Sequence, residues 1–502
     1  MLTSVRVLAL AAAAFAVAPA QTFAQTYDLL LQGGQVIDPD SQTNAVRDVA
    51  IKGGKIAKVA ASIPAGEARR VINVKGRYVT PGLIDLHFHS FGYSGSISPD
   101  QYALPAGTTT VIDAGGPGYR TVDAFRQQVV NKNKARVLGL MNIAGNGMTG
   151  SASEDNVADM LPDKTAEAIT KNRDIIVGIK VAHFGKPGWD ALKRAIDAGT
   201  RAKVPVMVDD KIFTNAGRTS EEKLLRVMRP GDMHTHMFND RQVEIISRFN
   251  SKVQPYALEA RKRGVLFDLG HGGGSMLWPV AVPAAKQGFW PDTISTDLHT
   301  SSIQLPQSDM PNCISKMMML GMSLPDAILK STVNPAKAIS RFPEMGTLRE
   351  GAIADVAVLV LHEGVFAYND AWGKKMLGTR KLENALTVRN GEVVYDSGLQ
   401  PRKESTEIYD LLLLTGSQSI AIKGSRIVKV AASIPPRQGR AVIPGLGYKV
   451  EASPMVEGAP ADIVLRDGQR RALIIKAGKV IRDEDGLYVS DATYVGPYSN
   501  FK

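Results

Sequence analysis

The stretch Val79-Thr80-Pro81-Gly82-Leu83-Ile84-Asp85-Leu86-His87-Phe88-His89 decides the fold of this 502-residue chain. Pro81-Gly82 indicates a turn, and the apolar run after it predicts a buried β-strand that ends at Ser90-Phe91-Gly92. Side chains of a strand alternate between its faces, so His87 and His89 share one face. Two imidazoles leaving one strand end on one face are typical of a metal site. The alternative is a pair of histidines on a solvated strand, and the residues that follow argue against it.

Length and composition are those of a globular protein with a large core. The chain is long enough for two or more domains, and it is 44% hydrophobic and 22% charged. The formal net charge is +11, yet no block of Lys and Arg is interleaved with aromatic residues. We therefore expect no nucleic-acid partner and, at most, a weak attraction to anionic surfaces or substrates.

The first residues have the pattern of a targeting segment. Arg6 precedes an apolar run rich in Ala and Leu, and small residues follow at 18–20 and 22–24. We predict a signal peptide over residues 1–24, removed by cleavage after its last residue. An uncleaved anchor helix is the alternative, but the run is too short for a stable membrane span. The single cysteine, Cys313, excludes internal disulfides and is expected to be packed, so the sequence predicts an exported soluble protein, periplasmic in a Gram-negative bacterium.

Strands and helices alternate over the middle of the chain. Residues 25–80 have the texture of short strands and turns, and residues 343–400 return to it. Between them, over 81–342, apolar strands such as 108–113 and 175–181 alternate with helical patterns. This alternation predicts an α/β fold, a closed (β/α)8 TIM-like barrel with its chemistry at the carboxyl ends of the strands. We expect this barrel to be inserted in a small composite β-domain.

The end of the chain repeats its beginning. The segment 27–31 recurs as 409–413, and Lys58–Pro64 recurs identically at Lys429–Pro435. An identity of seven residues is too long for chance. We predict that residues 409–486 form an extra C-terminal β-domain, a degenerate second copy from which the barrel has been lost.

The copy departs from the first β-domain where the histidine strand should follow. Pro444-Gly445-Leu446 matches Pro81-Gly82-Leu83, but Gly447-Tyr448-Lys449-Val450 stands in place of the histidines. We interpret the copy as structural, either an inert remnant or a packing or dimer surface. Whether the chain forms a homo-oligomer stays open.

A lysine closes one of the predicted barrel strands. Lys180 follows the apolar run 175–179, where a free ammonium would be costly to bury. A lysine carboxylated by carbon dioxide is instead an anion with two oxygens, suited to bridging two divalent cations. A lysine paired to an acid or reaching solvent is the alternative, and the neighbouring histidine pair favours the carbamate.

Further candidates lie at the ends of later strands. His234 and His236 form a second pair spaced i, i+2. Asp297 ends another run, where its carboxylate could bind a metal and accept a proton from a bridging water. His271 lies in a glycine-rich loop that lets backbone approach a ligand, so we predict a substrate contact, with a simple tight turn as the alternative. His183 is equally consistent with the pocket and with the surface.

Together these motifs resemble the signature of the amidohydrolase superfamily, which includes dihydroorotases, hydantoinases and D-aminoacylases. The resemblance covers residues 27–400, and the combination is more specific than any single motif. Five further segments resemble one branch of the superfamily, whose members are called deacetylases. They are Gly178-Ile179-Lys180, Gly231–His236, the His271 loop, Ser295-Thr296-Asp297 and Ser331–Ala338.

The resemblance implies a set of metal ligands. His87, His89 and Asp297 would hold one divalent ion, Lys180 would bridge as its carbamate, and His236 would hold the second ion. One or two divalent metal ions are thus implied as cofactors, with zinc the expected metal.

One position departs from the family pattern. Relatives commonly have a histidine after the strand 205–208, where this chain has Asp209-Asp210. Asp209 could bind through oxygen, which zinc accepts. Alternatively, His234 could replace the missing imidazole, since it is expected on the same strand face as His236. A third alternative is an altered or mononuclear site, so the departure leaves the second metal open but not the first.

The predicted activity is metal-assisted hydrolysis of a small-molecule acyl amide or ester. The metal lowers the pKa of a bound water towards about 7 and polarises the scissile carbonyl, and Asp297 takes the proton and returns it to the leaving group. An N-acyl or N-acetyl deacylase is the leading prediction, and a cyclic amidase of dihydroorotase or hydantoinase type is the alternative. A catalytically inactive, metal-free binding scaffold is the alternative of another class, and the intact ligand set argues against it.

Overall fold

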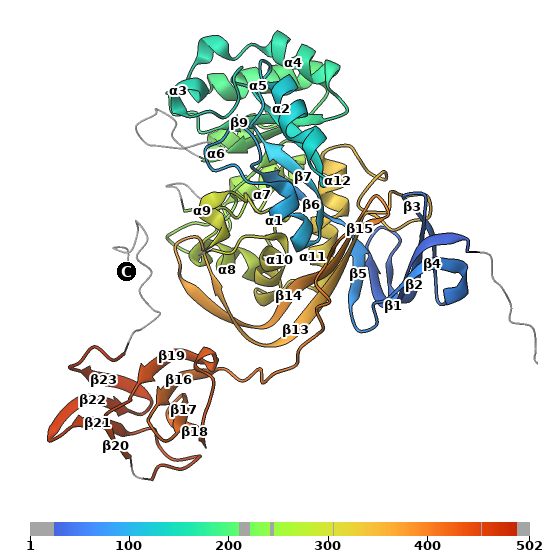
Figure 1. Cartoon of the computed structure of the whole chain (residues 1–502). Helices are drawn as coiled ribbons and strands as arrows, with labels where there is room; N and C mark the ends of the chain where they lie inside the picture. The colour runs from blue at the N-terminus through green and yellow to red at the C-terminus, as the bar shows by residue number, and fades with distance from the viewer. Residues whose placement is uncertain (1–24, 210–220, 241–244, 305, 453, 489–502) are drawn as a thin grey trace, which may run out of the picture.

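The computed structural model describes residues 25–209, 221–240, 245–304, 306–452 and 454–488. The predicted signal peptide and Asp210 lie outside these ranges. Within them, no helix is both long enough and apolar enough to cross a membrane. Figure 1 shows a barrel with its helices, a β-sheet beside it, and a separate β-unit formed by the end of the chain.

An eight-stranded sheet combines the first strands of the chain with strands that follow the barrel. Its order is β15-β14-β13-β5-β1-β2-β3, with β4 paired to β1. β5 is the joint, because it runs parallel to β1 and antiparallel to β13. The strands are β1 (Tyr27–Asp38), β2 (Thr43–Lys52), β3 (Lys55–Ala60), β4 (Ala68–Asn73), β5 (Tyr78–Pro81), β13 (Val356–Asn369), β14 (Lys375–Arg389) and β15 (Glu392–Asp396).

Seven parallel strands form most of the barrel wall, in the order β12-β11-β10-β9-β8-β7-β6. The chain then returns to the eighth position, where Thr293 forms a parallel bridge with Asp268 and Leu298 forms one with Phe88. These bridges join the last strand position to the first, and the predicted α/β barrel is confirmed. The strands are β6 (Leu83–Phe88), β7 (Thr108–Ala114), β8 (Arg136–Asn142), β9 (Ile176–Ala182), β10 (Val206–Asp209), β11 (Met233–His234) and β12 (Leu266–Phe267).

Helices cover the outside of the barrel, as α5 illustrates. Ala191, Ala195, Ala198 and Ala202 recur at helical spacing and are all buried, so one face of α5 packs on the barrel. The helices are α1 (Pro99–Tyr102), α2 (Val122–Gln128), α3 (Ser151–Glu154), α4 (Pro162–Lys171), α5 (Asp190–Ala202), α6 (Glu221–Val227), α7 (Pro255–Arg263), α8 (Trp278–Lys286), α9 (Thr300–Ile303), α10 (Met310–Met319), α11 (Leu324–Ser331) and α12 (Val333–Ala338).

Apolar side chains fill the interior of the barrel at the end where its strands begin. Leu86, Ile112, Met207 and Met233 point inward from four strands and pack with Ala336 of α12. This plug closes the end of the barrel at which the strands begin. Polar side chains can therefore collect only above it, at the carboxyl ends of the strands.

The end of the chain folds into two four-stranded sheets that repeat the first β-domain. β16 pairs antiparallel with β17 and parallel with β19, as β1 does with β2 and β4. The strands are β16 (Tyr409–Leu414), β17 (Ser419–Lys423), β18 (Arg426–Ala431), β19 (Gly439–Pro444), β20 (Lys449–Ala452), β21 (Ile463–Asp467), β22 (Arg470–Lys476) and β23 (Lys479–Asp483).

The match of Pro444-Gly445-Leu446 to Pro81-Gly82-Leu83 is wrong. The amide of Gly445 donates to the carbonyl of Leu414 (2.7 Å), whereas in the first domain the equivalent donor is Val74, which bonds to Gln32 (2.9 Å). The motif therefore corresponds to residues 73–75, at the end of β4. Backbone pairing sets the register, and the three shared letters coincide by chance.

The true point of barrel insertion lies one strand later. Ala452 of β20 pairs with Ile463 of β21, just as Pro81 of β5 pairs with Val356 of β13. In the first domain residues 82–355 connect that pair, and in the copy residues 453–462 do so. The same two-stranded joint therefore exists with the barrel and without it.

Candidate metal centre

His87 and His89 stand at the carboxyl end of β6. Both side chains are buried. The neighbouring Asp85 ties β6 to the eighth strand position, because its Oδ1 accepts a hydrogen bond from the amide of Thr296 (3.0 Å). The amide of Asp297 donates to the carbonyl of His87 (2.7 Å), which brings the end of the eighth strand position beside β6. The predicted histidine pair and the predicted aspartate thus meet at one end of the barrel.

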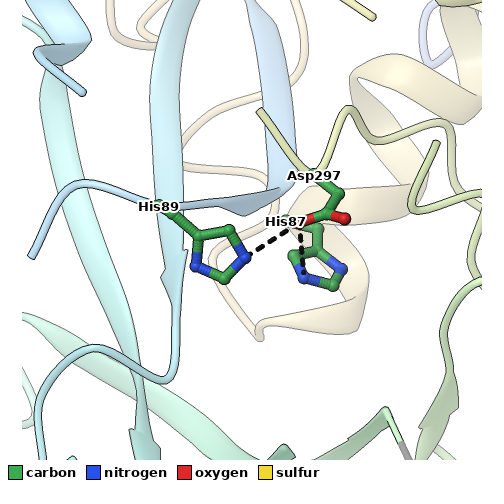
Figure 2. Close-up of side chains that lie close together, drawn as sticks. All are labelled: His87, His89 and Asp297. Atoms are coloured by element: carbon green, nitrogen blue, oxygen red, sulfur yellow. Dashed lines mark hydrogen bonds and ion pairs between the residues drawn. The ribbon is translucent and has the colours of Figure 1, made fainter. Parts of the chain in front are cut away.

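The three side chains form a compact cluster (Figure 2). Nε2 of His89 lies 2.8 Å from Oδ1 of Asp297, and Nε2 of His87 lies 3.5 Å from the same oxygen. All three ligand atoms lie within 4.8 Å of one another. Two imidazole nitrogens and a carboxylate oxygen at this spacing suit a divalent ion such as zinc.

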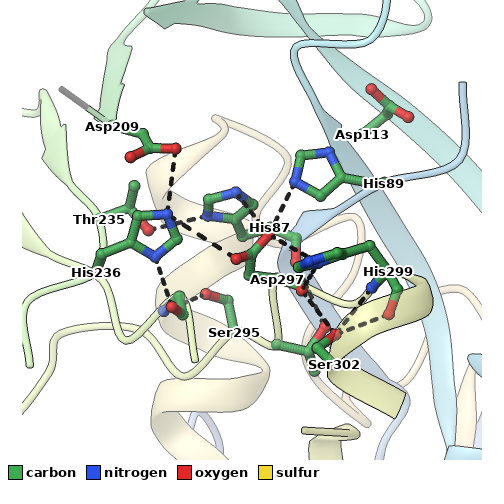
Figure 3. A network of polar contacts seen from close by, with 12 residues as sticks. His87, His89, Asp113, Asp209, Thr235, His236, Ser295, Asp297, His299 and Ser302 are labelled. Atoms are coloured by element: carbon green, nitrogen blue, oxygen red, sulfur yellow. Dashed lines mark hydrogen bonds and ion pairs between the residues drawn. The ribbon is translucent and has the colours of Figure 1, made fainter. Parts of the chain in front are cut away.

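A hydrogen-bonded chain fixes the tautomer of His87 (Figure 3). Nδ1 of His87 lies 2.9 Å from the hydroxyl oxygen of Thr235. That hydroxyl donates to Oδ2 of Asp268 (2.8 Å). Because the threonine proton is committed to the carboxylate, Nδ1 of His87 must carry the proton and donate it. Nε2 then presents a lone pair to the cluster, which is the form that binds a metal.

His236 is oriented in the same way from the opposite side. Its Nδ1 lies 2.6 Å from the carbonyl oxygen of Gly270, which can only accept, so Nδ1 is protonated and Nε2 carries a lone pair. That Nε2 lies 3.2 Å from Oδ2 of Asp209 and 4.0 Å from Oδ2 of Asp297. Asp209 and His236 therefore form a second pair of ligand candidates next to the first cluster.

Lys180 lies between the two groups. Its Nζ is 3.1 Å from Nε2 of His87 and 3.9 Å from Oδ2 of Asp209, and the side chain is fully buried. Burial is the largest cause that lowers the pKa of Lys180, so the environment disfavours the ammonium. The neutral amine is the form that reacts with carbon dioxide.

The carboxylates of the site are held in the ionised form. Burial alone would raise the pKa of Asp297, but the surrounding imidazoles of His87, His299 and His89 hold it well below its usual value. His236 and Lys180 do the same for the pKa of Asp209. Two ionised carboxylates among imidazole nitrogens form a donor set suited to divalent cations.

A cavity of about 230 Å³ opens over these residues. His183 contributes to its wall, where its Nε2 lies 3.6 Å from Oδ2 of Asp209 and its Nδ1 lies 3.5 Å from Oε1 of Glu154. The structure therefore places His183 in the pocket, one of the two alternatives left by the sequence. The lining residues are His89, Tyr93, His183, Asp209, His236, Gly273, Gly274, Ser275, Asp297, His299 and Ser301.

The expectation that His234 shares the strand face of His236 is wrong. β11 ends at His234, and His236 has a left-handed backbone with φ of 61°, so the alternation of faces stops between them. The ring of His234 packs against Phe267, with 5.7 Å between ring centroids. Phe267 belongs to the apolar core between the barrel strands and the surrounding helices. His234 thus faces the helices, away from the metal ligands.

The sequence predicts a substrate contact for His271, but the structure places its ring in the protein interior. The ring is fully buried, and its Nε2 accepts a hydrogen bond from Nζ of Lys316 (2.7 Å) on α10. His271 is not among the residues that line the cavity. Its neighbour Gly272 approaches the site instead, through backbone, because a Cβ built there would stand 2.2 Å from Oδ2 of Asp297.

The residues that support the metal ligands were not predicted from the sequence. Thr235 and Asp268 orient His87, and Asp113 accepts from the amides of Ser90 and Phe91 (2.7 and 2.9 Å) and thereby fixes the chain after His89. Asp113 and Asp268 each stand at the carboxyl end of an apolar run. That position is the signal by which they could have been found.

Comparisons with known proteins agree with this geometry. A sequence model described as "Amidohydrolase family" matches residues 280–394. A deacetylase of Enterococcus faecalis is 30% identical over 383 residues, which are 74% of this chain and 100% of that protein. A dihydroorotase of Aquifex aeolicus is 25% identical and covers 73% of this chain and 99% of its own length.

Solved structures give the same picture. The crystal structure of an adenine deaminase matches with a TM-score of 0.68 and 29% identity, covering 74% of this chain and 100% of that one. The crystal structure of a dihydroorotase matches with a TM-score of 0.66 and 27% identity, covering 74% and 99%. The matched length leaves about a quarter of this chain outside the shared fold.

Proposed function

The chain belongs to the amidohydrolase family and is a hydrolase of C–N bonds other than peptide bonds, and from this premise we propose that it is a metal-dependent deacylase of N-acyl or N-acetyl compounds. The observation that carries the proposal is the cluster of His87, His89 and Asp297, with the tautomer of His87 fixed by Thr235. The relatives named deacetylase support the acyl substrate.

The residues of the site have distinct parts in this reaction. A divalent ion, when bound, supplies Lewis-acid activation of water and polarises the substrate carbonyl. His87, His89 and Asp297 would hold this ion. Asp297, kept ionised by its neighbours, accepts a proton from the attacking water and returns it to the leaving nitrogen, so that the C–N bond breaks to give a carboxylate and an amine.

A second ion would need ligands besides those of the first cluster. His236 and Asp209 are the ligands available for it, and a carboxylated Lys180 would reach both groups from its place between them. Asp209 thereby takes the position that relatives give to a histidine. Imidazole and carboxylate ligands suit zinc, which we propose as the metal.

The protein is further proposed to be exported. The support is the pattern of residues 1–24, a basic residue followed by an apolar run and small residues. Processing after Ala24 would release the chain into the periplasm of a Gram-negative bacterium.

The activity is tested on the zinc-loaded full chain with four kinds of substrate: N-acetyl amino acids, acyl esters, dihydroorotate and hydantoin. We expect amine release from the N-acetyl compounds, and a loss of about 10²–10⁴-fold in kcat for Asp297→Asn. His234→Phe is the matched control, since it keeps a ring against Phe267 and should retain activity.

Two outcomes would change the proposal. Opening of dihydroorotate or hydantoin without release from N-acetyl compounds would assign the cyclic-amidase alternative, to which the dihydroorotase relative points. No turnover of any substrate by fully loaded protein would overturn both forms of the proposal.

A further inference from the structure

Arg77 is a buried cation without an anionic partner. It follows Gly76 in the turn before β5, and only 6% of its surface is exposed. Its guanidinium makes one long hydrogen bond, from Nη2 to the carbonyl of Gly398 (3.5 Å), and its buried Nε makes none. No carboxylate among the described residues forms an ion pair with it.

A guanidinium in this position is costly. It carries a positive charge and five N–H donors in a rigid fork. Buried charges in proteins are normally paired, and a buried donor without an acceptor points to an ion or ligand that would complete it. The guanidinium of Arg77 therefore lacks the anionic acceptor that a buried charge normally has.

Arg77 lines a groove whose walls come from the eight-stranded sheet and from the segment that leads into α11. The groove holds about 1060 Å³ and runs between β1, β2 and the chain that enters α11. Lys75 and Arg380 add two more cations, and none of the described residues that line it is acidic. The electrostatic character of the groove therefore favours an anion.

Apolar side chains form much of the remaining wall. Ile37 lies on β1, Val46 on β2 and Leu361 on β13, while Leu324 begins α11 and Met322 lies just before it. Val46 is 57% exposed, which is unusual for an apolar side chain of its size. A ligand that satisfied Arg77 would thus leave its remaining part against an apolar surface.

The duplicated β-domain shows that the fold does not require a charge here. Gly447-Tyr448 occupies the turn before β20, as Gly76-Arg77 does before β5. The hydroxyl of Tyr448 donates to Oδ2 of Asp485 (2.9 Å), so the copy satisfies its polar group internally. In the first domain the same position holds a cation whose partner must come from elsewhere.

We propose that this groove binds a small organic carboxylate. The carboxylate lies on the fork of Arg77, which matches it with two parallel hydrogen bonds, and an apolar body lies against Val46 and Leu361. The site is separate from the metal centre, since the two share no lining residue. It stands independently of the proposed deacylase activity.

The test is calorimetric titration of the zinc-loaded full chain with hexanoate, acetate and inorganic phosphate in a chloride buffer of constant ionic strength. We expect hexanoate to bind at least tenfold more tightly than acetate or phosphate. Arg77→Met should weaken hexanoate at least tenfold, whereas Arg69→Met, an exposed arginine paired to Asp28, should leave it unchanged. Equal binding of phosphate and hexanoate, or equal binding to Arg77→Met, would overturn the proposal.

Two further measurements distinguish binding in the groove from binding at the metal centre and from a structural role of Arg77. A carboxylate can also bind at the metal centre, so the titration is repeated on His87→Ala, in which groove binding should persist. Without ligand, Arg77→Met should melt no lower than the parent protein, because it removes an unpaired buried charge. A lower melting temperature together with no hexanoate effect on the parent would assign Arg77 a purely structural role. Should Arg77→Met fail to fold, Arg77→Lys, which keeps the charge without the fork, must still weaken hexanoate.

Discussion

The backbone of Gly272 lies directly against the carboxylate of Asp297. A Cβ built on Gly272 would stand 2.2 Å from Oδ2, and the residue has a left-handed φ of 55°. No side chain can be added here without moving the aspartate or the loop. Glycine is therefore required at this position by the geometry of the metal site.

Gly272→Ala should lower kcat by about 10²-fold, because a displacement of about 1 Å in a catalytic group costs that much. Gly288→Ala is the matched control, since Gly288 also has a left-handed φ (72°), lies outside the cavity, and a Cβ there meets nothing within 4 Å. Steady-state kinetics on both variants, with zinc content recorded, checks the prediction. Equal activity of the two variants would contradict it.

Thr235→Val should weaken zinc binding by about 10- to 100-fold, the usual loss when an outer partner of a metal-binding histidine is removed. The valine keeps the shape but removes the hydroxyl that links His87 to Asp268, so the tautomer of His87 is no longer fixed. Competition with a chelator of known affinity measures the loss. Thr165→Val, a buried threonine whose hydroxyl lacks a hydrogen bond, should bind zinc as the parent does.

Metal content per chain distinguishes a binuclear site from a mononuclear one. We expect near two equivalents by plasma mass spectrometry in the parent protein, and a decrease towards one in Asp209→Ala. His234→Phe should retain the full content, because its ring lies on the opposite face of the strand. One equivalent in the parent, unchanged in Asp209→Ala and lost in His87→Ala, would instead establish a mononuclear site.

Lys316 should make stability depend on alkaline pH. Burial lowers the pKa of Lys316 from 10.5 to about 8, so the unfolded chain binds this proton more tightly than the folded chain. The penalty is full below pH 8 and disappears as the pH rises to 10.5. Relative to Lys316→Met, the free energy of unfolding of the parent should increase over this interval by about 3 kcal/mol.

Urea unfolding of chelator-treated protein at several pH values measures this difference. Lys262→Met provides the control, because Lys262 is exposed and its removal should leave the pH dependence unchanged. Parallel curves for the parent and Lys316→Met would contradict the assigned burial effect.

Side-chain patterns predicted the main parts of the fold and several members of the site. The apolar run before His87 and the alternation of strands and helices depend on local sequence, so they indicate the barrel directly. His87, His89 and Asp297 come together because parallel strands end at the same edge. Their placement follows from strand ends alone.

The orientations of His234 and His271 could not be predicted, because they depend on backbone turns and on partners far apart in the sequence. The left-handed residue His236 ends the alternation of faces and sends His234 outward, and sequence gives no sign of it. His271 is drawn away from the cavity by Lys316, which lies 45 positions later in the chain. Contacts of this kind exist only once the helices have packed.

The joint between Pro81 and Val356 has a consequence for the order of folding. In the first domain this pair of strands closes a loop that is roughly 27-fold longer than the loop between Ala452 and Ile463, which costs about 3 kcal/mol more in chain entropy. The barrel must therefore draw the ends together before β5 and β13 can pair. The C-terminal copy, with its short-range contacts, should acquire protection from hydrogen exchange earlier than its twin.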